Sequence, residues 1–123
     1  IIPGLNSDEI FDICEAVSKA GAKSLGHTMV RLNGAIALLF EDWIQKTFPL
    51  KATRVMNLIS TTQGGKLGNS TFGERVRGVG TMAVSINEQV RLAKKKNGLA
   101  LKPKPLNTAV YQSAPSTQLN LFV

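Results

Sequence analysis

The feature that most constrains this chain is one stretch, residues 23–32, whose successive side chains would alternate between the two faces of a β-strand. Leu25 and Met29 fall on one face of this stretch, and Val30 and Leu32 fall on the opposite face. Apolar side chains on both faces are typical of a strand that is covered on both sides, as in a parallel sheet. A lone strand leaves its backbone N–H and C=O groups unpaired, which is costly in a protein interior. We therefore expect this strand to need neighbours.

The first ten residues, IIPGLNSDEI, read as the end of a strand that runs directly into a helix. The β-branched pair Ile1-Ile2 precedes a Pro-Gly turn, and Asn6 with Glu9 three positions later fits a capping box. Ile1-Ile2 is thus the one further strand stub that the chain offers to residues 23–32. We expect the chain to be the C-terminal piece of a larger protein, cut inside a β-to-α unit.

Four helices are predicted from apolar residues that recur at helical spacing. They span roughly residues 7–20, 35–47, 50–62 and 81–97, and the segment from residue 99 onward reads as a flexible tail. The residues expected on the apolar faces are Ile10, Ile13, Cys14, Val17, Ile36, Leu39, Phe40, Trp43, Ile44, Ala52, Val55, Met56, Ile59, Met82, Ile86, Val90 and Ala93.

Length, cysteine content and hydropathy limit the class of protein. A chain of 123 residues has room for one small domain, and its 43% hydrophobic content supports a core. The single cysteine, Cys14, excludes an internal disulfide framework and a multi-cysteine metal site within this chain. Its place on an apolar face predicts a buried small hydrophobe instead of a nucleophile. No apolar run approaches the roughly 20 residues of a membrane span, so we expect no membrane partner and a cytoplasmic setting.

The positive charge of the chain is concentrated in its second part. Residues 51–123 carry eleven basic and two acidic side chains, whereas residues 1–50 carry four basic and six acidic ones. Such an imbalance favours contact with a polyanion such as nucleic acid. The alternative is a surface whose lysines and arginines only keep the protein in solution.

A glycine-rich, basic loop, KLGNSTFGERVRGVG, occupies residues 66–80. Glycines let a backbone come close to a phosphate, and cations supply the charge, although the loop matches no P-loop pattern. Phe72 is its only aromatic residue, which gives little support to a base-stacking platform. The alternative is a flexible, solvent-exposed connector. The residues expected to contact nucleic acid are Lys66, Arg75 and Arg77 of the loop and Arg91, Lys94 and Lys95 of the last helix.

Several spaced motifs carry a resemblance to a known family. The stretches PGLNSDEI, AGAKSLGHTMVRL and FEDWIQKTFP, followed by the GGK and FGERVRG parts of the loop, are similar to the C-terminal part of radical S-adenosylmethionine proteins. The family in question is related to spore photoproduct lyase and is described as DNA repair photolyase-like. The resemblance covers roughly residues 1–98, with Asn33 standing where the family tends to have proline and Ser7 where it has an acidic residue.

The resemblance implies an α/β fragment that is mostly helical. Residues 1–48 would hold the last βα units of a partial (β/α) barrel, residues 49–98 a basic helical extension, and residues 99–123 the tail. The intact parent would be a lyase-like iron–sulfur enzyme acting on nucleic acid, in which reductive cleavage of S-adenosylmethionine yields a hydrogen-abstracting radical. The rival hypothesis is a non-catalytic basic module that binds nucleic acid or a partner protein.

The resemblance also implies a cofactor site at the carboxyl ends of the strands, where barrel enzymes carry their reacting groups. Ile2, Pro3, Gly4 and Leu5 would line the adenosine of S-adenosylmethionine, and Arg31 would pair with a carboxylate of the cofactor or with an anionic substrate. The alternatives are a plain turn at Pro3-Gly4, and a structural ion pair or a surface charge at Arg31. His27 is expected to be a hydrogen-bonded structural residue instead of a proton carrier.

The 4Fe–4S cluster of the family needs three cysteines at CxxxCxxC spacing, which this chain lacks. We therefore expect the chain to be inactive alone. Near the end of the sequence, QLNLF is similar to the QLxLF peptide with which bacterial polymerases and repair proteins bind the sliding clamp. Its anchoring residues would be Gln118, Leu119, Leu121 and Phe122. The alternative is a tail that docks on its own domain.

Overall fold

Helices dominate the computed structural model, which describes residues 1–109 and 111. The elements are the 3-10 helix η1 (Ser7–Glu9) and the α-helices α1 (Ile10–Lys19), α2 (Ala35–Thr47), α3 (Pro49–Thr62), α4 (Glu74–Arg77) and α5 (Gly80–Lys96). The mostly helical prediction is confirmed, and the four predicted helices are found close to their expected ends. The short helix α4 lies inside the glycine-rich loop and was not predicted.

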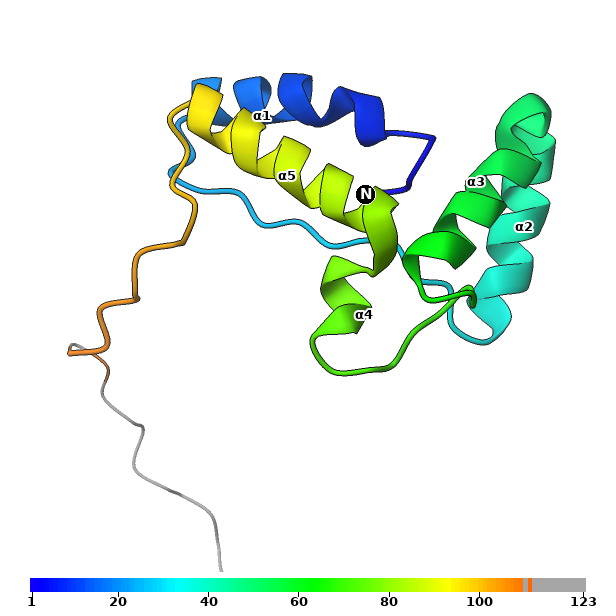
Figure 1. Cartoon of the computed structure of the whole chain (residues 1–123). Helices are drawn as coiled ribbons and strands as arrows, with labels where there is room; N and C mark the ends of the chain where they lie inside the picture. The colour runs from blue at the N-terminus through cyan, green and yellow to red at the C-terminus, as the bar shows by residue number, and fades with distance from the viewer. Residues whose placement is uncertain (110, 112–123) are drawn as a thin grey trace, which may run out of the picture.

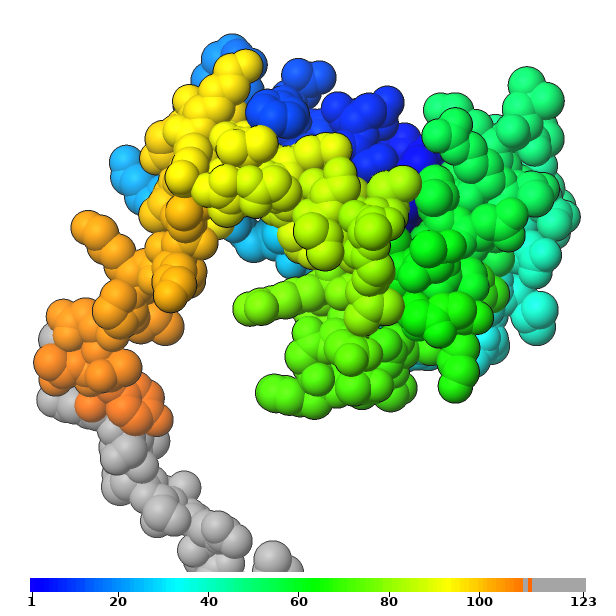
Figure 2. Space-filling view, in the orientation of Figure 1, coloured from blue at the N-terminus to red at the C-terminus, as the bar shows by residue number. Residues whose placement is uncertain are grey.

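The helices form two pairs joined by an extended stretch of chain. α1 packs along α5, α2 packs along α3, and α3 also contacts α5. The stretch from residue 22 to residue 34 runs from the α1–α5 pair to the α2–α3 pair (Figure 1). In the space-filling view the glycine-rich loop and α4 form the lower edge of the helical body, apart from the chain that follows α5 (Figure 2).

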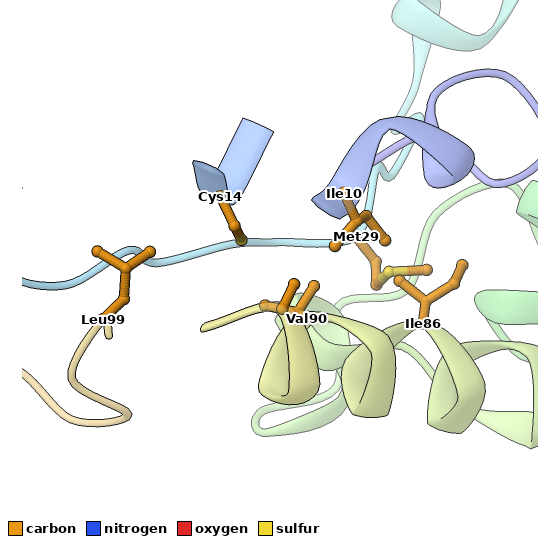
Figure 3. Packing of buried hydrophobic residues seen from close by; sticks show 7 residues of the cluster. Ile10, Cys14, Met29, Ile86, Val90 and Leu99 are labelled. Carbon is orange, nitrogen blue, oxygen red and sulfur yellow. The ribbon is translucent and has the colours of Figure 1, made fainter. Parts of the chain in front are cut away.

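The extended stretch is covered on both faces, as its two apolar faces predicted. Leu25 and Met29 pack in a first cluster with α1 and α5. Val30 and Leu32 pack in a second cluster with α2 and α3. Cys14 is fully buried, which confirms it as a buried small hydrophobe. In Figure 3 its side chain points from α1 toward α5, which carries Val90, while the side chain of Met29 extends toward Ile86. The same stretch therefore divides the two halves of the core and belongs to both.

The strand predicted over residues 23–32 is not formed as part of a sheet. The described residues contain no named strand, only an isolated parallel bridge between Ser24 and Ala100. The stretch is extended, but a β-ladder needs a neighbouring strand that pairs with it over several residues. Here the stretch pairs only with isolated residues from different parts of the described chain. The partial-barrel part of the predicted fold class is accordingly not seen.

One short pairing nevertheless has the pattern of a parallel sheet. The nitrogen of Ile1 donates to Thr28 O at 2.6 Å, and the N–H of Val30 donates to Ile1 O at 2.9 Å. Ile1 thus bonds through its nitrogen to the residue before Met29 and through its carbonyl to the residue after it. This pair of hydrogen bonds is the repeating unit of parallel strand pairing. Ile1 thus lies beside the extended stretch, with η1 and α1 connecting the two.

The turn after Ile1-Ile2 differs from the predicted capping box. Asn6 Oδ1 accepts from the N–H of Ile2 at 2.8 Å, and Ser7 Oγ accepts from the N–H of Gly4 at 3.1 Å. Asn6 makes no side-chain bond to the helix that follows. The predicted cap is therefore wrong, because the asparagine folds back to close the Pro3-Gly4 turn.

Several apolar residues differ from their expected burial. Ile13 is 42% exposed, and on α2 the side chains of Ile36, Leu39 and Trp43 remain largely open to solvent, while Ile44 is fully buried. Among the helices α2 contacts mainly α3, and its residues Phe40 and Ile44 also pack with Leu32 of the extended stretch. Ile36, Leu39 and Trp43 lie on the side of α2 that these contacts leave exposed. Leu99, expected at the start of the tail, is instead buried in the first cluster.

Gly78 and Gly21 both have a positive φ, but only Gly78 is also closely surrounded by other atoms. A Cβ on Gly78, at φ +72°, would lie 3.0 Å from both Ala83 Cβ and Thr62 O, whereas one on Gly21, at φ +87°, would meet nothing within 4 Å. Gly21→Ala should lower the free energy of unfolding by about 1 kcal/mol through strain alone. Gly78→Ala should lower it by roughly 3 kcal/mol, because the methyl group also needs space.

Urea denaturation followed by circular dichroism measures both variants, with Gly21→Ala serving as the matched control. Equal losses of stability in the two would contradict the close contact at Gly78.

Candidate nucleic-acid interface

The glycine-rich loop is docked onto the carboxyl end of the extended stretch. The N–H of Leu32 donates to Leu67 O at 2.7 Å, and Leu67 packs against the second cluster. A Cβ on Gly68 would lie 1.8 Å from Asn33 Oδ1 and 3.1 Å from Leu32 O. Glycine is therefore what lets the loop pass over this end of the stretch. This part of the loop is a fixed element instead of a free connector.

α4 is held in place through its backbone carbonyls. Val76 O accepts from the N–H of Met29 at 2.9 Å, and Arg77 O accepts from Asn87 Nδ2 at 3.0 Å. Asn87 belongs to α5 and also donates to Ala83 O within its own helix. Because both partners come from the packed body of the protein, α4 is presented on a firm base. Sequence reasoning missed Asn87, since no local pattern relates it to the loop.

The three basic residues predicted in the loop are exposed and share one region of the surface. Lys66 lies in the loop before α4, and Arg75 and Arg77 lie on α4. None of the three takes part in an ion pair within the described residues. Phe72 is 90% exposed, and the guanidinium of Arg75 lies 5.7 Å from its ring centroid. The aromatic ring and the free cations are thus offered to solvent together.

Arg91 and Lys95 of α5 differ in their surroundings. Arg91 is bonded through its guanidinium to the carboxylate of Glu88, with Arg91 Nε to Glu88 Oε2 at 2.8 Å. That bond lowers the pKa of Glu88 and raises the pKa of Arg91. Lys95 is exposed in the last turn of α5. Arg91 is therefore already paired with a carboxylate, unlike the cations of the loop.

Lys94, predicted to contact nucleic acid, points into the protein. Its side chain is only 7% exposed, and its Nζ donates to Leu25 O at 2.8 Å and to Leu101 O at 3.0 Å. A buried ammonium group needs hydrogen-bond partners, and these two carbonyls supply them. Lys94 thus ties the extended stretch and the chain after α5 to the helix, and it is not available to a phosphate at the surface.

A polar hollow of about 450 Å³ opens in the glycine-rich loop. Its wall includes a cation, Lys66, two hydroxyls, Ser70 and Thr71, and the carboxylate of Glu74. Asn69, which also lines it, donates through Nδ2 to Glu74 Oε2 at 3.0 Å and accepts from the N–H of Thr71 at 2.8 Å. These two bonds shape the wall and leave Glu74 Oε1 without a protein partner among the described residues.

Gln63, at the end of α3, closes the hollow from the side of the core. It is 2% exposed, and its Nε2 donates to Val30 O at 3.0 Å. Its Oε1 is buried and has no hydrogen-bond partner within the described part of the chain. A buried acceptor without a partner costs about 1–3 kcal/mol. Sequence reasoning missed Gln63, which reads as an ordinary polar residue after a helix.

The residues expected to line a cofactor are packed against protein. Pro3 is fully buried, and Ile2 and Leu5 pack in the second cluster. A Cβ on Gly4, at φ +76°, would lie 2.6 Å from Leu58 Cδ1, so the close approach that this glycine permits is to α3. None of the cavities described in this part of the chain is lined by residues 2–5.

Arg31 and His27 lie on the extended stretch with different surroundings. Arg31 is exposed and has no ion pair within the described residues. His27 Nε2 lies 2.7 Å from Asn87 Oδ1, which confirms the expected hydrogen-bonded histidine. Because Asn87 Nδ2 donates to two carbonyls, its Oδ1 faces the ring, and His27 Nε2 must be the donor.

A second cavity, of about 590 Å³, lies beside His27. Its wall comprises part of the extended stretch, α5 and the chain after α5, and it includes Arg91, Lys94 and Lys102. Two of these three cations already have protein partners: Arg91 is paired with Glu88, and Lys94 donates to two carbonyls. It therefore offers fewer free polar groups than the hollow in the loop.

The described residues hold no group of three or more His, Cys, Asp or Glu side chains that could bind a metal ion. Burial raises the pKa of the Cys14 thiol, and the nearby charge of Lys94 opposes this shift. A thiol held in its neutral form is a poor metal ligand and a poor nucleophile.

No helix in residues 1–109 is both long and apolar enough to cross a membrane. The sliding-clamp motif, with Gln118, Leu119, Leu121 and Phe122, lies outside the described residues and stays a prediction. Comparisons with family models, with curated proteins and with solved structures found no match to this chain.

Substitution of Lys94 tests whether its ammonium group is bonded inside the protein. Lys94→Met keeps the apolar stem but leaves the carbonyls of Leu25 and Leu101 without their donor, so it should lower the free energy of unfolding by about 1–3 kcal/mol. Lys95→Met, at the exposed neighbouring position, should change it by less than about 0.5 kcal/mol. Urea denaturation measures both, and a neutral Lys94→Met would contradict the inward position of the ammonium group.

Proposed function

We propose that this chain is part of a radical S-adenosylmethionine enzyme of the DNA repair photolyase-like class, and that it contributes a surface that binds nucleic acid. The observation that carries the first part is the parallel pairing of Ile1 with the residues around Met29, with α1 between the two stretches. Strand, helix and parallel strand form the repeating unit of (β/α) barrels. The motif resemblance implies this order at these residues.

The open surfaces beside this unit support a larger sheet. The N–H groups of Gly26, His27 and Thr28 have no hydrogen-bond partner among the described residues. The apolar side chains of α2 that face solvent are of the kind that a helix of a (β/α) unit buries against a sheet. Both features have an explanation if further parallel strands lie beside residues 25–32 in the intact protein.

The nucleic-acid part of the proposal is supported by the loop and α4. Lys66, Arg75 and Arg77 are exposed cations without carboxylate partners in the described chain, next to an exposed phenylalanine. Free cations gain most from a phosphate backbone, because no existing ion pair has to be broken. α4 presents two of them from a backbone that is anchored to Met29 and Asn87.

The described residues hold no ligand set for an iron–sulfur cluster, because Cys14 is the only cysteine and is buried. Gly4 lies against Leu58 of α3, and Ile2 and Leu5 pack in the second cluster. The radical chemistry of the class is supplied by S-adenosylmethionine and the iron–sulfur cluster. In this proposal those groups are held elsewhere in the intact protein, and the residues described here bind and position the nucleic acid.

A second candidate function is a basic module that binds nucleic acid without catalysis. The close approach of Gly4 to Leu58 of α3 and the packing of Leu5 in the second cluster favour this candidate, because both contacts are with protein. The two candidates share the nucleic-acid surface and differ in whether the gene encodes a cluster-binding segment.

The coding sequence upstream of Ile1 separates the two candidates. The enzyme proposal expects a CxxxCxxC segment in the same reading frame, and the protein expressed with that segment should bind iron and sulfide as measured by its absorption spectrum and metal content. An upstream frame without these cysteines would exclude the enzyme and leave the basic module.

The nucleic-acid surface is tested by fluorescence anisotropy of DNA binding over a range of salt concentrations. The logarithm of the affinity should fall linearly with the logarithm of the salt concentration, with a slope of about −0.9 for each neutralised phosphate. Replacing Lys66, Arg75 and Arg77 together by alanine should reduce that slope by roughly 2–3.

The control replaces Lys19, Lys23 and Lys46 by alanine, which removes the same charge from the acidic half of the chain. If both triple variants weaken binding equally, net charge explains the affinity and the loop is not the interface.

A further inference from the structure

The hollow in the glycine-rich loop offers hydrogen-bonding groups that suit a nucleobase better than a phosphate. One acceptor in its wall, Glu74 Oε1, has no hydrogen-bond partner among the described residues. A phosphodiester has no donor for this acceptor, and it is repelled by the carboxylate of Glu74. The exocyclic amino group of a base is a donor that carboxylate and amide oxygens accept well.

The same wall also provides donors. Lys66 is an exposed ammonium group, and the hydroxyls of Ser70 and Thr71 make no hydrogen bond to the described protein. Base edges carry ring nitrogens and carbonyl oxygens next to their amino groups, so they need donors and acceptors side by side. The mixture of one cation, two hydroxyls and one open acceptor meets that need.

The hollow lies at the end of the extended stretch where the loop is fixed most firmly. The bond from Leu32 to Leu67 and the close approach of Gly68 to Asn33 hold its floor. Asn69 bridges Glu74 and Thr71 and so fixes the carboxylate within the wall. A site that discriminates between ligands needs groups held in place before binding.

We infer that this hollow binds one unpaired nucleobase carrying an exocyclic amino group, with Glu74 accepting a hydrogen bond from that group. The inference rests on the proposed nucleic-acid function and names the part of the ligand that this site takes. A paired base has its Watson–Crick edge occupied, so the site favours single-stranded or flipped-out nucleotides over a duplex. The exposed cations of the loop and α4 would hold the neighbouring phosphates.

Because Glu74 is negatively charged, the two explanations predict opposite changes in DNA affinity when it is replaced by glutamine. If the loop attracts DNA only by its charge, Glu74→Gln removes a negative charge and strengthens binding to every form of DNA. If Glu74 accepts from a base, Glu74→Gln weakens binding to single strands. The reason is that Gln can keep its oxygen on Asn69 only by turning its NH₂ group toward the base.

The probes are a labelled oligonucleotide of cytosines, one of thymines, and the duplex of the cytosine strand with its complement. We expect Glu74→Gln to weaken binding of the cytosine strand roughly tenfold and to leave the duplex unchanged or tighter. The thymine strand, which lacks an exocyclic amino group, should respond less than the cytosine strand. Circular dichroism checks that the exposed substitution leaves the fold intact.

Glu88→Gln is the matched control, because it removes the same charge from α5 outside the hollow. It should tighten binding of all three probes slightly. If Glu74→Gln behaves like Glu88→Gln, the carboxylate acts through charge alone and the inference is overturned, while the proposed function stands. If the unmodified protein binds none of the probes, the nucleic-acid function and the inference both fall.

Discussion

The extended stretch of residues 23–33 has two apolar faces and a row of backbone N–H and C=O groups. The rest of the fold buries the apolar faces and supplies hydrogen-bond partners to many of the backbone groups. Its faces are covered by two separate helix pairs, one around Met29 and the other around Leu32. Its backbone is served by unlike partners: Ile1, the loop carbonyls of Leu67 and Val76, and the side chains of Gln63 and Lys94. Burying an extended chain requires such partners when no sheet supplies them.

This constraint also explains where the candidate site lies. The loop and α4 reach the stretch because they hydrogen-bond its backbone, and that attachment gives the hollow a fixed floor. Gln63 serves the stretch with its NH₂ group, which leaves its oxygen without a partner in the described chain. α4 is attached in a similar way: its backbone carbonyls anchor it, while its arginine side chains remain exposed.

Sequence patterns predicted the helices well and the contacts around them less well. The spacing of apolar residues predicted the ends of α2, α3 and α5 almost to the residue, because each helix has a regular apolar stripe and is followed by residues that end a helix. The capping box at Asn6 failed, since the same side chain had a closer donor in Ile2. Two of the predicted contact residues have protein partners instead: Lys94 donates to buried carbonyls and Arg91 pairs with Glu88. Charge alone does not indicate which way a lysine on a helix points.

By itself the sequence determined the helix boundaries, the burial of Cys14 and the covering of residues 23–32 on both faces, because these follow from local periodicity and side-chain hydropathy. Tertiary structure alone decided the inward position of Lys94, the polar hollow and the close passages at Gly68 and Gly78. These depend on pairs distant in the chain, such as Lys94 with Leu25, 69 residues apart, and Gln63 with Val30, 33 residues apart. A one-dimensional pattern cannot encode such pairs, because they exist only once the helices have packed around the extended stretch.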